Sequence, residues 1–162
     1  LGAVDEAFVV GLLERWDGPV VLDADGLNEV TYTADLERRA DTVITPHTGE
    51  FARLTGDSPG HAAATSLASR TGATVLLKGN PTFVTDGDET WVVTSGGPEL
   101  ATIGTGDVLT GMVAAYVAGG LPTPVAARSA AFHHGEAASA LNEQRTVTAT
   151  TLVEAIAAHG KS

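Results

Sequence analysis

The sequence predicts an α/β fold in which a mainly parallel central sheet is flanked by layers of helices. Three short apolar runs, at residues 20–22, 42–44 and 75–77, have the length and composition of buried parallel strands. Segments with apolar residues at helical spacing separate these runs, as expected where a crossover connection leads to each parallel strand. The 162 residues are enough for one domain with a sizeable core, and 43% of them are apolar.

The acidic composition limits the partners. The formal net charge is −11, and the only lysines are Lys78 and Lys161. Duplex nucleic acid requires a basic surface, so we expect no nucleic-acid partner. The sequence has no cysteine, no apolar run of transmembrane length and no signal-peptide pattern, so we expect a cytoplasmic protein that binds no membrane. The excess of carboxylates fits a high-salt cytoplasm and ordinary solubility equally well.

The first half of the chain alternates between helix and strand signals. Asp5 is the predicted N-cap of an amphipathic helix, which residues 17–19 break before the first strand. The polar run that begins at Asp23 fits a turn as well as a metal or ribose contact. Glu50 complements the start of a later helix by its charge. The predicted elements are a helix at 5–16, a strand at 20–22, a short polar helix at 34–40, a strand at 42–44 and a helix from about 51.

The second half adds one more helix and the third strand, then a hairpin, and ends in helices only. At 57–59 a possible capping side chain is followed by proline, which predicts the start of a helix. The polar run at 86–89 predicts the turn of a hairpin. His133 and His134 lie on different faces of one predicted helix, so one of them is expected to face a site. The predicted elements are a helix from 57 to about 70, a strand at 75–77, a hairpin of 83–84 with 91–93, and helices from 106 or 107 to about 118, from about 122 to 141 and from about 150 to 159.

Polar residues follow all three predicted parallel strands. Asp23 follows the first strand, His47 the second and Lys78 the third. Open α/β sheets bind their ligands at this edge. A lysine followed by glycine suits a phosphate contact, and its position in a chain so poor in lysine favours that interpretation over a surface role.

A glycine-rich segment precedes the next helix. Gly104 and Gly106 allow close backbone approach, and the free N–H groups of a helix N-terminus bind anions. Asp107 would repel a phosphate unless it accepts a proton from the group that attacks the phosphate, so we interpret it as the base of a phosphoryl transfer. A simple N-cap role for Asp107 is the alternative.

Motifs of several other enzyme classes are missing. The sequence contains no P-loop, no Gly-x-Gly-x-x-Gly fingerprint and no His-Glu-x-x-His zinc motif. Its one Gly-x-Ser-x-Gly string, at 56–60, follows a predicted helix and not the strand that a nucleophile elbow requires. These absences leave an α/β enzyme that handles phosphate.

Four segments resemble one family and occur in that family's order. They read VLDAD with LN at 21–28, ITPHTGE at 44–50, LKGNPT at 77–82 and GTGDVLTG at 104–111. In these segments the chain is similar to the ADP-dependent (S)-NAD(P)H-hydrate dehydratases, of ribokinase-like fold. Many ribokinase-like kinases share the last segment, whereas the second and third together are more specific to the dehydratases.

The resemblance implies repair of hydrated nicotinamide cofactor. The (6S)-hydrate of NADH or NADPH would be dehydrated at the expense of ADP, or of ATP as in some relatives, giving AMP and phosphate. Mg²⁺ would screen the phosphates, and no side chain is assigned as a metal ligand. The resemblance also implies a homo-oligomer and an NAD(P)H-hydrate epimerase, fused or separate, as a partner.

The resemblance also implies roles for individual residues. Asp107 would be the catalytic base and contact the substrate hydroxyl, and His47 would contact the hydrated cofactor. The amides around Gly104 to Gly106 would hold the transferred phosphate. The residues implied in nucleotide binding are Lys78, Gly79, Asn80, Pro81, Thr82, Gly104, Thr105 and Gly106.

Two departures from the family pattern bear on these expectations. Ile103 stands where the family has a glycine, which predicts a less open anion loop. The family's N-terminal part has no counterpart here, so we expect residues 1–162 to form a single partial domain. Two alternatives therefore stay open: a small-molecule kinase of the same fold, acting on a vitamin precursor or a sugar, and a non-catalytic fragment that binds nucleotide.

Overall fold

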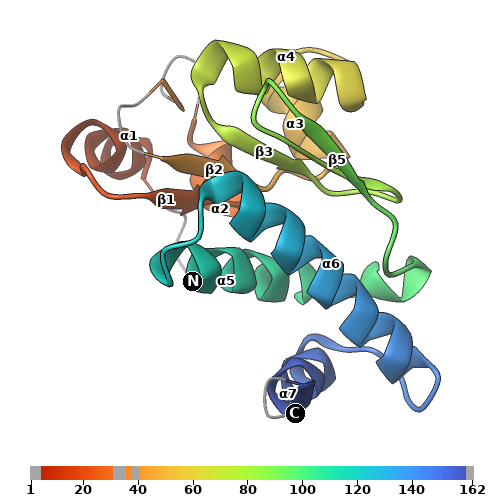
Figure 1. Cartoon of the computed structure of the whole chain (residues 1–162). Helices are drawn as coiled ribbons and strands as arrows, with labels where there is room; N and C mark the ends of the chain where they lie inside the picture. Colours follow the sequence, from red (N-terminus) through yellow and green to blue (C-terminus); the bar gives the residue numbers. More distant parts are fainter. Residues whose placement is uncertain (1–4, 31–35, 38–40, 160–162) are drawn as a thin grey trace.

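The computed structural model of the chain describes residues 5–30, 36–37 and 41–159 (Figure 1). All but two residues of the helix predicted at 34–40 lie outside these ranges. No helix within the ranges is both long enough and apolar enough to cross a membrane. The elements are α1 Glu6–Arg15, β1 Val20–Leu22, α2 Ala24–Asn28, β2 Thr42–Ile44, α3 Thr48–Thr55, α4 His61–Thr71, β3 Thr74–Leu77, β4 Thr82–Thr85, β5 Thr90–Val93, the 3₁₀ helix η2 Pro98–Leu100, α5 Thr105–Ala118, α6 Thr123–Asn142 and α7 Ala149–His159.

The described strands form one mixed sheet in the order β1-β2-β3-β4-β5. Strands β1, β2 and β3 are parallel, with Val21 opposite Val43 and Ile44 opposite Val75. Strands β4 and β5 form the predicted hairpin and extend the sheet antiparallel to β3. The three predicted parallel strands are therefore confirmed, and their carboxyl ends share one edge of the sheet.

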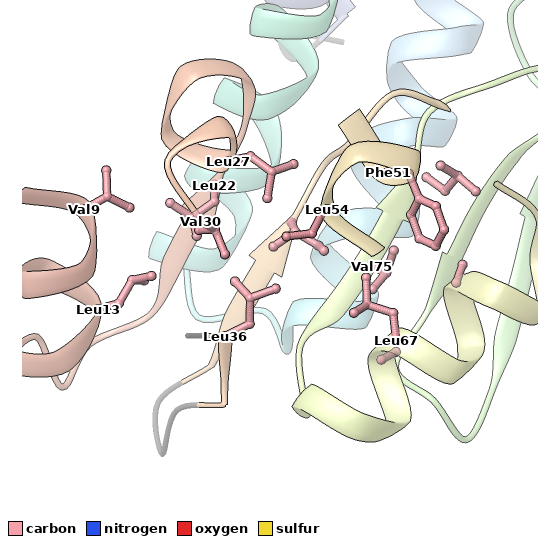
Figure 2. Packing of buried hydrophobic residues seen from close by; sticks show 14 residues of the cluster. Val9, Leu13, Leu22, Leu27, Val30, Leu36, Phe51, Leu54, Leu67 and Val75 are labelled. Carbon is pink, nitrogen blue, oxygen red and sulfur yellow. The ribbon is translucent and has the colours of Figure 1, made fainter. Parts of the chain in front are cut away.

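Helices cover both faces of the sheet (Figure 1). On one face, residues of α1, α2, α3 and α4 pack against Ile44, Val75 and Leu77 in a cluster that Figure 2 shows from close by. On the other face, α5 and α6 pack against Val43 and Leu76, because neighbouring strand residues point to opposite faces. Helix α7 packs against α6 at the end of the molecule away from the sheet. This is the predicted layered α/β fold.

Helix ends account for most differences from the predicted elements. Asp5 is the N-cap of α1 as predicted, and its Oδ1 accepts a hydrogen bond from the N–H of Ala7 at 2.8 Å. Helix α4 begins at His61, four residues after Asp57, so the prediction of a start at 57–59 is wrong. The run after Asp23 forms the short helix α2 instead of a turn. A capping signal in the sequence thus marks a region better than it marks a boundary.

Candidate nucleotide site

The sheet edge brings together the polar residues that follow β1, β2 and β3. The N–H of Lys78 donates to the carbonyl of Pro46 at 2.8 Å, and His47 and Lys78 form a parallel bridge beyond the ends of β2 and β3. The Nζ of Lys78 lies 2.7 Å from Oδ1 of Asp23. The expectation that these residues share one edge is confirmed.

His47 also begins helix α3. Its Nδ1 accepts the N–H groups of Gly49 at 2.9 Å and Glu50 at 3.3 Å, and the Glu50 carboxylate accepts the N–H of His47 at 2.7 Å. This reciprocal pair is a capping box, with histidine where serine or threonine is common. Since Nδ1 accepts hydrogen bonds in this arrangement, Nε2 carries the ring hydrogen in the neutral side chain. The side chain is 58% exposed, and its Nε2 lies 3.4 Å from Oε1 of Glu50.

Lys78 lies in a compact charged cluster. Besides Asp23 at 2.7 Å, it has Glu50 at 4.0 Å, and the three side chains are between 9% and 19% exposed. One cation therefore faces two carboxylates in a largely buried setting, where Coulomb interactions are stronger than in water. The sequence placed Lys78 at this edge but gave no sign that Asp23 is its partner.

Helix α5 begins on an unusual turn. Its N-cap is Gly104, which has a φ of 86° and no side chain to cap the helix. Because that φ is strained for residues with a Cβ, glycine suits the position. Among the described residues, no acceptor is present for the N–H groups of Gly106 and Asp107. The first turn of α5 thus has the geometry of an anion site.

The helix starts one or two residues earlier than predicted. Its first residue is Thr105, so Asp107 is the third helical residue and not an N-cap. The Asp107 side chain is exposed to solvent. Ile103, just before the turn, is 96% exposed, so its side chain is not packed against the anion loop. The expectation that isoleucine here makes the loop less open to an anion stays a prediction.

A cavity of about 470 Å³ lies between the sheet edge, the start of α5 and helix α6. Seven of the residues implied by the resemblance line it, whereas Pro81, Gly104 and Asp107 do not. Its far wall comes from the segment after β5 and from α6, which no motif singled out as a wall. The lining residues are His47, Lys78, Gly79, Asn80, Thr82, Val93, Ser95, Gly96, Gly97, Pro98, Leu100, Ala101, Thr105, Gly106, Leu109, Ala131 and His134.

His134 connects α6 to the first turn of α5. It is 4% exposed, and its Nε2 lies 2.9 Å from the carbonyl oxygen of Thr105. A carbonyl only accepts, so Nε2 carries the hydrogen. Burial lowers the pKa of His134 below its ordinary value, and the hydrogen bond to Thr105 opposes this shift. Of the two adjacent histidines, His134 faces the cavity and His133 is exposed, as the sequence led us to expect for one of the pair.

We expect His134 to make stability depend on pH. Its pKa is lower in the folded chain than the unfolded value of 6.5, so the unfolded chain binds more protons as the pH falls. The contribution to the free energy of unfolding is complete above pH 6.5 and is lost below it, by at most about 1.4 kcal/mol per pH unit. In His134→Gln, whose amide keeps a donor near Thr105, this part of the pH dependence should disappear.

Urea unfolding of the wild type and His134→Gln between pH 5 and pH 8 measures this difference. His133→Gln, an exposed neighbour on the same helix, is the control and should keep the wild-type profile. A His134→Gln profile identical to the wild type would contradict the assignment.

The layered sheet and the turn before α5 indicate a fold class, within which the particular family can then be identified. The ribokinase-like superfamily protein of Enterococcus faecalis superimposes with a TM-score of 0.68 over 96% of this chain and 66% of that chain, at 22% identity. The chain therefore has a ribokinase-like fold. Within that class it belongs to the NAD(P)H-hydrate dehydratase family, whose model matches residues 2–158.

Two further relatives are more similar in sequence. The bifunctional NAD(P)H-hydrate repair enzyme Nnr of Mycobacterium leprae is 49% identical over 129 residues, covering 76% of this chain and 27% of that protein. The ADP/ATP-dependent NAD(P)H-hydrate dehydratase of Bacillus subtilis, co-crystallised with ATP and Mg²⁺, superimposes with a TM-score of 0.79 at 31% identity over 90% of this chain. This chain covers 55% of the B. subtilis structure. It therefore spans about half the length of that relative, and a smaller share of the longer M. leprae protein.

Proposed function

We propose that the chain binds an adenine nucleotide in the 470 Å³ cavity and uses it to dehydrate NAD(P)H hydrate. The proposal depends on one observation: the Lys78 ammonium group lies beside the first turn of α5 at the cavity wall. A Cβ added at Gly106 would lie 3.6 Å from the Nζ of Lys78, so the ammonium group lies against that turn. An ammonium group and free backbone N–H groups at one point favour a phosphate there.

The proposed roles follow from this arrangement. The nucleotide is bound by residues 78–82 and by Gly104 to Gly106. The apolar far wall of the cavity, around Leu100 and Ala131, faces the adenine ring. Asp107 lies on the solvent side of the same helix terminus and receives the proton of the substrate hydroxyl. His47, whose side chain is exposed, contacts the hydrated cofactor.

The chemistry turns a poor leaving group into a good one. The hydroxyl oxygen of the hydrate attacks the β-phosphorus of ADP, the bond from that phosphorus to the bridging oxygen breaks, and AMP leaves. The hydroxyl proton passes to Asp107. The carbon–oxygen bond of the phosphate ester then breaks with loss of a proton from the neighbouring ring carbon, which gives phosphate and the dihydronicotinamide.

Among residues 5–30, 36–37 and 41–159, no three His, Cys, Asp or Glu side chains gather closely enough to hold a metal ion. The donor set of this part of the chain therefore does not fit a dedicated metal site. Mg²⁺ bound to the nucleotide phosphates would neutralise their charge.

We further propose that the chain works in the cytoplasm as a homo-oligomer, beside an NAD(P)H-hydrate epimerase on the same or a separate chain. The absence of cysteine supports a reducing compartment. The M. leprae relative is described as a bifunctional repair enzyme, which supports a second repair activity nearby.

The test is to incubate the full chain with hydrated NADH, Mg²⁺ and either ADP or ATP. We expect dihydronicotinamide absorbance to recover and, with ADP, AMP and phosphate to form in equal amounts. Hydrate without nucleotide is the control. If neither nucleotide restores absorbance, the dehydratase proposal fails. Nucleotide binding alone would then favour the non-catalytic alternative, and phosphorylation of a vitamin precursor or sugar would favour the kinase.

A further inference from the structure

The ion pair between Asp23 and Lys78 connects two strands that are not neighbours. Asp23 follows β1 and Lys78 follows β3, and β2 lies between these strands in the sheet. The side chains meet at 2.7 Å, although they are 55 residues apart in sequence. The exposed fractions are 19% for Lys78 and 9% for Asp23, so the pair is largely shielded from water.

The second oxygen of the same carboxylate reaches helix α5. Its Oδ2 accepts a hydrogen bond from Thr110 Oγ1 at 2.6 Å. Thr110 lies one turn after Gly106, and its Oγ1 is also 3.1 Å from the Gly106 carbonyl oxygen. Asp23 therefore contacts the lysine through one oxygen and the first turns of α5 through the other.

This bridge leaves Lys78 available for a ligand. An ammonium group has three N–H donors, and Asp23 uses one of them. Glu50, at 4.0 Å, is beyond hydrogen-bond distance. Within the part of the chain that the structure describes, two donors therefore remain on a nitrogen that lies against Gly106, at the cavity wall.

We propose that Asp23 and Thr110 are positioning residues, which hold the Lys78 ammonium group beside the N-terminus of α5 so that both act on the same phosphate of the nucleotide. This inference rests on the proposed nucleotide site. A free lysine side chain has many rotamers, and fixing it before the ligand arrives reduces the entropy lost on binding. The carboxylate fixes the lysine, and the hydroxyl fixes the carboxylate relative to the helix.

The competing view is that Asp23 lowers affinity, because its negative charge repels phosphate and occupies the lysine. The two views predict opposite signs. If Asp23 only repels, Asp23→Asn binds ADP more tightly. If Asp23 positions Lys78, Asp23→Asn binds ADP more weakly, although a negative charge has been removed.

The experiment is titration calorimetry of the full chain with ADP and Mg²⁺, for the wild type, Asp23→Asn and Thr110→Val. We expect Kd to rise about 10- to 100-fold in both variants, by analogy with the loss of the hydrogen bonds that orient metal ligands. Thr110→Ser keeps the hydroxyl and should restore near wild-type affinity. Asp25→Asn, the same charge change at an exposed position two residues away, should leave Kd near the wild-type value.

Thr110→Val also controls for misfolding of Asp23→Asn, because it preserves every charge of the cluster and nearly the shape of the threonine side chain. Unchanged or tighter ADP binding by folded Asp23→Asn and Thr110→Val would overturn the inference, as would a wild-type chain that binds no ADP. ADP binding without recovery of dihydronicotinamide would instead overturn the dehydratase activity and leave the positioning result standing.

Discussion

Replacement of Asp107 by asparagine is expected to reduce turnover of NAD(P)H hydrate at least about 100-fold, the lower range for loss of a general base. Asparagine has nearly the same shape but cannot accept the hydroxyl proton. The loss should appear in kcat, because Asp107 lies outside the cavity wall that we assign to the nucleotide. Binding of AMP should be retained or strengthened, since the change removes a negative charge near the phosphate site.

The measurement pairs steady-state recovery of dihydronicotinamide absorbance with calorimetric titration of AMP. Asp57→Asn, which changes another exposed carboxylate, between α3 and α4, is the control and should keep wild-type turnover. Unchanged turnover in Asp107→Asn would refute the base assignment. Loss of AMP binding would show that Asp107 supports the nucleotide site instead.

The exposed position of Asp107 fits this role. Successive residues of an α-helix point about 100° apart, so Gly106 and Asp107 face different directions from the same turn. Gly106 lines the cavity and Asp107 faces solvent. A phosphate held by the N–H groups of this turn would lie between the nucleotide on one side and the hydroxyl substrate on the other.

The sheet could be predicted because its signals are local. The runs at 20–22 and 42–44 contain only residues that suit a buried strand, and the structure has strands at those positions. The placement of Asp23 and Lys78 at one edge followed from parallel topology alone. The direct contact between them could not be predicted, because it depends on the register and twist that bring β1 and β3 together across β2.

The far wall of the cavity was missed for a related reason. Residues 95–101 contain two glycines and a proline, which signal a turn without saying what the turn faces. His134 lies in an alanine-rich helix, and its burial depends on the packing of α6 against α5. Strands and helices can be predicted from the pattern of neighbouring residues, whereas cavity walls depend on contacts between segments far apart in the chain.

Replacement of Phe51 by alanine is expected to lower the free energy of unfolding by about 3–5 kcal/mol, the usual range for a buried aromatic side chain. Phe51 is fully buried on α3 and packs in the cluster that contains Leu54, Leu67 and Val75 (Figure 2). Removing the ring leaves a cavity that this close-packed cluster fills only in part. The loss is a large fraction of the about 5–15 kcal/mol that stabilises a typical domain.

Urea unfolding gives this quantity, with Phe8→Ala as the matched control. The Phe8 side chain is 65% exposed on α1, so its removal should change the free energy by no more than about 0.5 kcal/mol. Equal losses in the two variants would contradict the placement of Phe51 in the core.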